Sequence, residues 1–465
     1  MTARSLTRDF IDAVWVLRAG EDDLAALRSL LFDHIGVTAA GAQTETARVV
    51  RRLVTSGHGP ALPVIGTELS AAAADAAFAN AVAGHCLEFD DTHSGASLHP
   101  GVVVFPAALA ASVLSGASPE QFVEGVVTGY EVMCRVGRAV DPAAHYRRHF
   151  HPTATVGHLA AAAAAARIMG LSAERAAEAV GVACTMAAGS LEFLSDGAWT
   201  KRLHPGLAVR NGLLAAQLVE AGFRGPVDGL GGPHGFLASY TDDPHPSRLL
   251  DGLGVDRLEI RNTSIKAHGC CRYNQGPIDG VVALRRRLEL VPADVKSIRV
   301  GVVSAAPTLI WNPPEQKRRP SSVVDAQFSL PYSVAVALIE GNADPNVFEP
   351  VRNGDPELQR LMNAVSCVVD PELDRHYPDQ WRCWVEIETV DGRTQTERVD
   401  EPKGEPGNPF SAEELREKVA RLTAGIYSPA ELDAISDALT ALPASGSFDA
   451  LIAAITSKAG LLTWD

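Results

Sequence analysis

Cysteine is scarce and irregularly spaced in this sequence. The 465 residues include seven cysteines, of which Cys270 and Cys271 are adjacent, and none belongs to a CxxC pair. An odd number without paired spacing fits neither a disulfide framework nor the usual zinc or iron–sulfur cages. We therefore expect reduced thiols, as in a cytosolic protein.

Long hydrophobic runs and excess positive charge are also missing. The longest apolar stretch, LAAAAAAARIMG from Leu159, is far shorter than a bilayer span, so we expect no membrane segment. The formal net charge of −15 argues against nucleic acid as a partner, because phosphates require a basic surface. The start MTARSLTRDFIDAV shows no apolar segment followed by a cleavage site, and we expect a cytoplasmic location.

Nucleotide-binding and nucleophile motifs are absent as well. The sequence has no Walker pattern, and GLGGPHG, which begins at Gly229, does not follow a strand. There is no nucleophile elbow. We therefore expect no bound nucleotide.

What the chain does contain is helical periodicity. From Phe10 to about Phe223, alanine and leucine recur every three or four residues, which predicts an all-α bundle. The predicted helices cover residues 22–41, 45–55, 70–86, 102–114, 119–140, 153–169 and 173–186.

The pattern changes around Leu249. A strand is predicted from Arg257, a β-rich stretch from Ser297, and a hairpin around the Asp391-Gly392 turn, which together indicate an α+β region. Helical periodicity returns afterwards, and these last helices are expected to pack on the amino-terminal bundle. The predicted helices in this half cover residues 277–290, 328–340, 412–424, 429–442 and 448–459.

The densest group of ionisable residues lies in GHCLEFDDTHSGASLHPG, residues 84–101. Such side chains are costly beside so much apolar sequence unless they are paired or used, so this segment predicts a functional site. The alternative is a helix C-terminus with its cap network. The segment contains His85, Glu88, Asp90, Asp91, Thr92, His93 and His99.

A metal site is an alternative for the same segment, because histidine and aspartate supply suitable ligand atoms. The pair His149 and His151 offers further nitrogens. The loops between the candidate ligands are long, however, and the prolines after the histidines indicate helix starts. We expect no metal.

Three histidines precede a proline at the start of a predicted helix: His99, His151 and His204. Proline suits the first helical position and keeps the preceding residue extended. Each imidazole is therefore expected beside unpaired N–H groups and the positive end of a helix dipole, which is a place for a carboxylate. The alternative is an ordinary turn.

Cations accompany these helix starts. Lys201 and Arg202 lie just ahead of His204, and Lys266 lies just ahead of Cys270. On an acidic protein this grouping predicts a pocket for a small polycarboxylate or a phosphate. Taken singly, each cation is typical of a solvated surface.

Histidines, a neighbouring acid and lysines suffice for one kind of chemistry. They can remove a proton next to a carboxylate and stabilise the enolate-like charge that results. An enzyme of this class could expel a β-hydroxyl group, reprotonate on the other face or release carbon dioxide. The residues alone leave these three reactions open.

Six strings resemble the MmgE/PrpD family, whose members include 2-methylcitrate dehydratase, cis-aconitate decarboxylase and iminodisuccinate epimerase. The strings run in order along the chain, and the resemblance covers roughly Ala13 to Leu422: LEFDDTHSGASLHPG, HPTATVGHLAAAAAAARIMGL, KRLHPGLAVRNGLLAAQLVEAGFRGP, SIKAHGCCRYNQGPIDGVVAL, DAQFSLPYSVAVALIEG and PKGEPGNPFSAEEL. The resemblance implies a mainly α protein and a homodimer, with a cofactor-free and metal-free site in the cleft between two domains. The larger, all-α domain would comprise residues 1–262 and 405–465, and the smaller α+β lid domain residues 263–404.

The resemblance also implies roles for single residues. His99 and His151 would be the acid/base pair, and Lys201 and Lys266 would bind substrate carboxylates. The remaining residues carried over by motif are Asp91 in the catalytic group, Thr92 and Tyr332 as hydrogen-bond donors, and Arg272 as a contact from the lid side.

Two departures from the family pattern bear on the substrate. Glu88 stands where relatives commonly carry aspartate, so its carboxylate reaches one methylene further. The lid string often reads KPYPCCR in relatives, whereas Ala267, His268 and Gly269 stand here. Glu88 and His268 are therefore counted among the substrate-binding candidates.

The first functional hypothesis is a hydro-lyase that removes water from a hydroxylated di- or tricarboxylate of the methylcitrate kind. The alternatives are an epimerase or a decarboxylase that uses the same residues. A third reading, from another class, is a non-catalytic carboxylate-binding protein on an enzyme fold.

Overall fold

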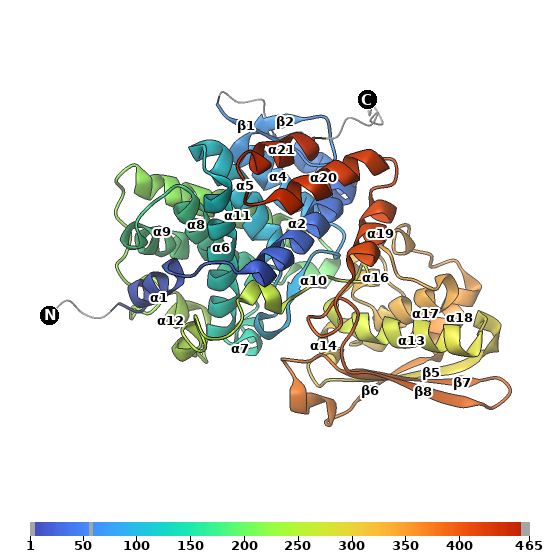
Figure 1. Cartoon of the computed structure of the whole chain (residues 1–465). Helices are drawn as coiled ribbons and strands as arrows, with labels where there is room; N and C mark the ends of the chain where they lie inside the picture. Colours follow the sequence, from blue (N-terminus) through green and yellow to red (C-terminus); the bar gives the residue numbers. More distant parts are fainter. Residues whose placement is uncertain (1–4, 55–58, 457–465) are drawn as a thin grey trace.

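The larger part of the molecule is helical and is built from both ends of the chain. The computed structural model describes residues 5–54 and 59–456. In Figure 1 the blue-to-green helices and the red helices form one body, and the yellow and orange segments form a smaller unit beside it. The helices of this body are α1 (Leu6–Trp15), α2 (Glu21–Gly41), α3 (Glu45–Arg51), α4 (Ala73–Gly84), α5 (Gly101–Ser115), α6 (Pro119–Ala139), α7 (Pro142–Arg147), α8 (Pro152–Ile168), α9 (Ala173–Met186), α10 (Phe193–Asp196), α11 (Thr200–Glu220), α12 (Phe236–Tyr240), α19 (Ala412–Leu422), α20 (Pro429–Ala441) and α21 (Ser447–Ala454).

The smaller unit combines a four-stranded sheet with helices. The strand order is β6-β5-β7-β8, in which β5 and β6 are parallel and the other neighbours are antiparallel. Its strands are β5 (Val295–Val302), β6 (Val365–Val369), β7 (Cys383–Thr389) and β8 (Thr394–Val399). Its helices are α13 (Gln275–Leu288), α14 (Pro307–Ile310), α15 (Pro314–Lys317), α16 (Val323–Gln327), α17 (Leu330–Glu340) and α18 (Pro356–Ala364).

Helix α8 runs through the middle of the helical body, where it contacts α5, α6, α9 and α11. Its alanines from Ala160 to Ala166 are fully buried. Small side chains on all sides let the neighbouring helices approach closely. At Gly212 of α11, for example, an added Cβ would lie only 2.4 Å from the Cβ of Ala161, so this crossing requires glycine. The alanine run is therefore the centre of the bundle.

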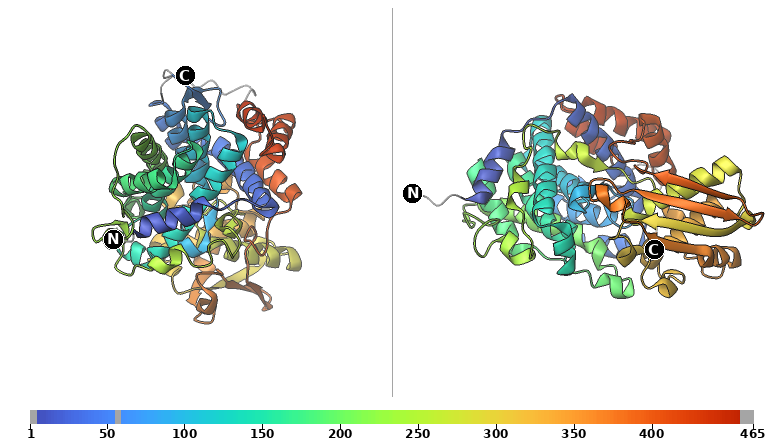
Figure 2. Two further views of the ribbon diagram at one scale, coloured as in Figure 1. Left: turned by 60° about the vertical axis from the view of Figure 1, so that its left-hand side comes forward. Right: turned by 90° about the horizontal axis from the view of Figure 1, so that it is seen from below.

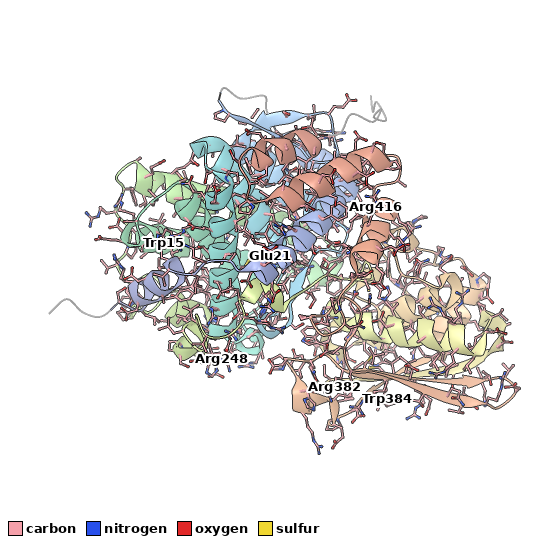
Figure 3. All side chains as sticks on the ribbon, in the orientation of Figure 1. Trp15, Glu21, Arg248, Arg382, Trp384 and Arg416 are labelled. Atoms are coloured by element: carbon pink, nitrogen blue, oxygen red, sulfur yellow. The ribbon has the colours of Figure 1, made fainter. Side chains whose placement is uncertain are left out.

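Alternating burial along β7 shows that one face of the sheet is packed and the other faces outward. Helices α13 and α17 lie against the strands, and the right view in Figure 2 shows the unit at one end of the molecule. On β7, Trp384 stands opposite Gly301 of β5, and an added Cβ at this glycine would meet the indole ring at about 2.0 Å. The indole, labelled in Figure 3, therefore takes the space that a side chain on Gly301 would fill.

Buried apolar residues fall into two main clusters. The first gathers residues from Phe10 to Ile265 and from Leu415 to Ile455, and the second gathers residues from Cys270 to Ile387. The protein is thus mainly α with a smaller α+β unit, as predicted. The domain division that we propose after residue 262 lies close to the change of cluster, although Ile265 still packs with the first.

Two short pairings fix the loops of the helical body. Strand β1 (Ala61–Pro63) pairs with β2 (Ser70–Ala72), and β3 (Thr92–His93) pairs with β4 (Thr263–Ser264). The second pairing joins the ionisable segment to the chain that leads into the smaller unit. Among the described residues, no helix is long and apolar enough to cross a bilayer.

Most predicted elements are confirmed. The Ser411 cap and its reciprocal bond with Glu414 begin α19, and the Asp391-Gly392 turn joins β7 and β8. The carboxyl-terminal helices pack on α2, as expected. The predicted ends at residues 55 and 457–459 lie outside the described residues.

Three local predictions were wrong. The strand expected from Arg257 is mostly a 3-10 turn, Glu259–Asn262, followed by the two-residue β4. The helix expected from residue 70 begins at Ala73, because residues 70–72 pair with β1. Finally, His204 does not precede a helix: α11 begins at Thr200 and Pro205 lies inside it.

The early start of α11 has a tertiary cause. Its first turn places Lys201 against Glu88 and lets Arg202 donate to the Thr46 hydroxyl at 2.7 Å, and both cations are buried. Pro205 removes the N–H that would bond the carbonyl four residues earlier. Contacts outside the helix hold the turn that precedes the proline.

Candidate active site

A cavity enclosing about 620 Å³ of empty space lies where the helical body meets the smaller unit. Its wall takes residues from the segment 88–99, from the starts of α8 and α11 and from α10, and from residues 266–273 and 309–381 on the other side. Seven of the ten predicted site residues line it: Glu88, Thr92, His99, His151, Lys201, Lys266 and Arg272.

Glu88 and two lysines form a buried ionic group at one side of the cavity. Lys201 Nζ contacts Glu88 Oε1 directly, while Lys266 Nζ donates to the Glu88 carbonyl at 2.8 Å and lies 3.7 Å from Oε2. Burial alone would raise the pKa of Glu88, but the two ammonium groups lower it to about 2. The group therefore holds one anion between two cations at neutral pH.

The backbone of Glu88 is unusual. Its φ of 53° lies in the left-handed region, which a residue with a Cβ adopts at an energetic cost. This conformation lets the side chain meet Lys201 while the carbonyl meets Lys266. The strained position thus coincides with the convergence of the two cations.

Asp90 holds two imidazoles. His85 Nδ1 and His99 Nδ1 lie 2.7 and 3.1 Å from Asp90 Oδ2, and His99 Nδ1 also lies 3.0 Å from the Asp91 carbonyl oxygen. Carboxylate and carbonyl oxygens only accept, so Nδ1 carries the proton in each ring. In the neutral ring of His99, Nε2 is left as a lone-pair nitrogen. Asp90 therefore orients His99 as a base.

His151 caps α8 with an extended backbone, as predicted, and its Nδ1 lies 3.0 Å from Nδ1 of His204. Near it, the His99 amide donates to the Thr153 hydroxyl at 3.1 Å, which ties the two predicted acid/base residues to one helix start. The His85 ring lies between them, with centroids 4.8 Å from His99 and 5.9 Å from His151.

Burial keeps these imidazoles neutral. Desolvation, opposed only in part by Asp90, lowers the pKa of His99 to about 4, and it lowers the pKa of His204 to about 4 as well. For His151, burial together with the neighbouring His204 and Lys201 moves the pKa well below its ordinary value. At neutral pH these rings are therefore uncharged, and each keeps one nitrogen with a lone pair.

The first turn of α5 is anchored by Asp91. Its carboxylate accepts from the Gly101 amide at 2.9 Å and from the Tyr130 hydroxyl at 2.7 Å, and burial raises its pKa to about 8. It does not line the cavity, so its predicted place in the catalytic group is not supported by contact. Thr92 does line it, and its hydroxyl has no hydrogen-bond partner within the described ranges.

Of the other site residues predicted in the smaller unit, one lines the cavity and two do not. Arg272 lines the cavity, contacts Glu405 and lies 5.3 Å from the centre of the Trp381 ring. Tyr332 and His268 do not line it: the Tyr332 hydroxyl donates to the Val347 carbonyl, and His268 pairs with Asp279 at 2.8 Å. Their positions in the motifs gave no sign of these partners.

Among the described residues, two groups have atoms that could hold a metal ion, and one of them is His85, Asp90 and His99, of which one atom each lies within 4.8 Å of the others. The second is Asp141, Asp243 and His245, away from the cavity. A histidine ligand must offer a lone pair to the ion. In the first group both Nδ1 atoms serve instead as donors to the same carboxylate. The arrangement is thus accounted for by hydrogen bonding.

Sequence reasoning missed the apolar and aromatic wall of the cavity. Helical periodicity does not distinguish a core side chain from one that faces a cleft, so these residues gave no separate signal. The missed lining residues include Tyr146, Leu191, Phe193, Tyr273, Leu309 and Trp381.

Replacing Glu88 by glutamine is expected to remove a pH-dependent part of the stability. The pKa of Glu88 is about 2 in the folded state against 4.5 for the free side chain, so the folded state binds fewer protons between these values. In the wild type, ionised Glu88 therefore contributes about 3 kcal/mol to the free energy of unfolding above pH 4.5. This contribution disappears as the pH falls towards 2. Urea unfolding at several pH values measures the difference.

The control for this experiment is Glu413→Gln, a change on the exposed first turn of α19. It should match the wild type at every pH. A Glu88→Gln protein whose deficit stayed constant from pH 6 to pH 3 would show that the two lysines do not hold this carboxylate ionised.

Comparisons with known proteins agree over nearly the whole chain. The family model described as the MmgE/PrpD N-terminal domain matches residues 9–249, and the MmgE/PrpD C-terminal domain matches residues 268–442. One similar curated protein is the cis-aconitate decarboxylase-like protein oryM of Aspergillus oryzae, 28% identical over 96% of each chain. Cis-aconitate decarboxylases of Aspergillus terreus and Mus musculus are each 27% identical, over 92% and 90% of this chain and 91% and 86% of theirs.

Proposed function

The chain belongs to the MmgE/PrpD family, and from this membership and the geometry of its cavity we propose that it is a lyase acting on a small di- or tricarboxylate. The observation that carries the proposal is the placement of two imidazoles, the partly buried His99 and the buried His151, in one cavity with the ammonium groups of Lys201 and Lys266. This set combines proton transfer with carboxylate binding.

The lysines would hold the substrate carboxylates. Each ammonium carries more than one N–H donor, and the contacts with Glu88 leave others for a ligand. Arg272 would add a cation from the smaller unit, and the free hydroxyl of Thr92 a neutral donor. The apolar part of the wall, which includes Leu191, would face the hydrocarbon part of the substrate.

We propose that the reaction is the loss of carbon dioxide from an unsaturated tricarboxylate of the cis-aconitate kind. The relatives named as cis-aconitate decarboxylases, which match this chain over most of their length, support this choice. In such a reaction the bond to one carboxylate breaks, and its electron pair forms a new carbon–carbon double bond. The electrons of the old double bond take up a proton at the far carbon, and the imidazole of His151 or His99 is placed to deliver it.

Dehydration of a hydroxylated tricarboxylate, as by a 2-methylcitrate dehydratase, is the second candidate. The observation in its favour is the tautomer of His99, whose Nε2 is a free base in the resting state. Such a base would remove the proton next to a carboxylate before the hydroxyl leaves. Decarboxylation thus needs an imidazole that donates a proton, whereas dehydration needs one that accepts a proton.

A single panel of substrates tests the proposal. The protein is incubated in deuterated water with cis-aconitate, citrate, 2-methylcitrate and malate, and products are followed by nuclear magnetic resonance together with release of carbon dioxide. We expect carbon dioxide and one deuteron per product from the unsaturated substrate. Loss of water from a hydroxy acid would establish the second candidate, inversion of a centre would indicate an epimerase, and binding without turnover would contradict the lyase proposal.

A further inference from the structure

The contact between His151 and His204 joins two separate cavities. His151 lines the cavity described above, whereas His204 lines a second one, of about 930 Å³, on the other side of this pair. The two Nδ1 atoms lie 3.0 Å apart, and the side chains are almost completely buried, with exposed fractions of 3% and 7% for the residues. The hydrogen bond therefore crosses the wall between the cavities.

The second cavity reaches the surface. Its wall includes Leu207 and Glu192, which are exposed, and Asn211, whose amide lies 3.1 Å from His158 Nε2. Water in this cavity can therefore meet the edge of His204 without passing through the first cavity.

An imidazole can take up a proton at one nitrogen and release another from the second nitrogen. The hydrogen bond between the two Nδ1 atoms leaves Nε2 of each ring outside the pair, and each ring belongs to the wall of a different cavity. A proton can therefore enter at Nε2 of His204, cross from Nδ1 to Nδ1 and leave from Nε2 of His151. After the step the remaining protons are on Nε2 of His204 and on Nδ1 of His151. The starting state returns when the pair opens and each ring changes tautomer by exchanging its proton with water.

We propose that His204 supplies protons from the second cavity to His151, and that it acts on the reaction only through His151. The proposal rests on the proposed function, because each loss of carbon dioxide consumes a proton that must come from solvent. The first cavity has a largely apolar wall and contains several cations. Protons that reach His151 through His204 do not have to pass the bound substrate. His204 is in this sense a positioning residue.

The test compares His204→Ala and His204→Gln with Leu207→Ala, a change in the wall of the same second cavity that leaves the imidazole pair intact. We expect kcat to fall about 10-fold or more in both His204 variants while KM changes less than about two-fold. Added imidazole should restore kcat in His204→Ala, whose vacated space opens to the second cavity. Leu207→Ala should resemble the wild type.

Three results would overturn the relay. One is an unchanged kcat in His204→Ala, and another is a loss that added imidazole does not relieve. The third is a normal kcat in His204→Gln, since a side-chain amide can hold the His151 ring but cannot pass a proton through it. Circular dichroism and thermal unfolding check that the variants are folded.

A second measurement does not depend on turnover, so a failure of the proposed function can be told apart from a failure of the relay. In histidine labelled with nitrogen-15, exchange of the His151 ring proton with solvent is followed by nuclear magnetic resonance. We expect slower exchange in His204→Gln than in Leu207→Ala. Equal rates would overturn the relay even for an enzyme whose substrate has not been found.

Discussion

Replacement of His99 by alanine is expected to lower kcat/KM about 10²- to 10⁴-fold, the range over which a positioned general acid or base contributes. Asp90 fixes the proton on Nδ1 of His99, so that Nε2 is the basic atom of a residue that lines the cavity. Because the pKa of His99 is about 4, its neutral ring predominates at neutral pH. Dehydration, which needs this base, should lose rate as the pH falls through about 4, whereas decarboxylation, which needs a proton donor, should not. Steady-state kinetics with the substrate identified above measure both effects.

The control is His376→Ala, which removes an exposed imidazole of the smaller unit. It should retain wild-type kcat/KM and the same acid limb. If His99→Ala kept more than about a tenth of the activity, His99 would be neither the acid nor the base of the reaction. If the wild-type kcat/KM fell on the acid side near pH 6.5 instead, the His99 ring would be more solvated than its burial indicates.

The features that could be predicted from the sequence are those determined by neighbouring residues. The Ser411 cap of α19 and the Asp391-Gly392 hairpin depend on side chains a few positions apart, and both are found as expected. The start of α11 was misplaced because Lys201 is held by Glu88, which is far away in the sequence. Propensity at Pro205 was outweighed by that tertiary contact.

The candidate site shows the same division. Its composition was visible in the segment 84–101, where ionisable residues are dense among apolar ones. The pairing of His151 with His204 and the use of Asp91 to anchor α5 arise from contacts between segments, which periodicity does not encode. Tyr332 illustrates the limit of carrying a role over by motif, because its hydroxyl is bonded to the Val347 carbonyl away from the cavity.

A single buried cation, Lys418 of α19, joins three parts of the molecule. Its Nζ lies 2.7 Å from Asp33 Oδ1 of α2 and donates to the Lys266 carbonyl at 2.7 Å. It also lies 3.9 Å from the centre of the Phe89 ring, next to Glu88. The carboxyl-terminal helices are in this way connected to the backbone that presents a substrate-binding lysine.

Replacing Lys418 by methionine is therefore expected to lower the free energy of unfolding by about 3–5 kcal/mol, because Asp33 would be left buried without its partner. Burial raises the pKa of Asp33, so the loss should shrink at low pH as this carboxyl takes up a proton. Urea unfolding with a paired Asp33→Leu, Lys418→Met variant is the control, since an apolar pair of similar size should restore most of the stability.

Lys403→Met, which breaks the partly exposed pair with Glu414, should cost no more than about 1 kcal/mol. A loss as small as this for Lys418→Met would show that α19 is held by its apolar contacts alone.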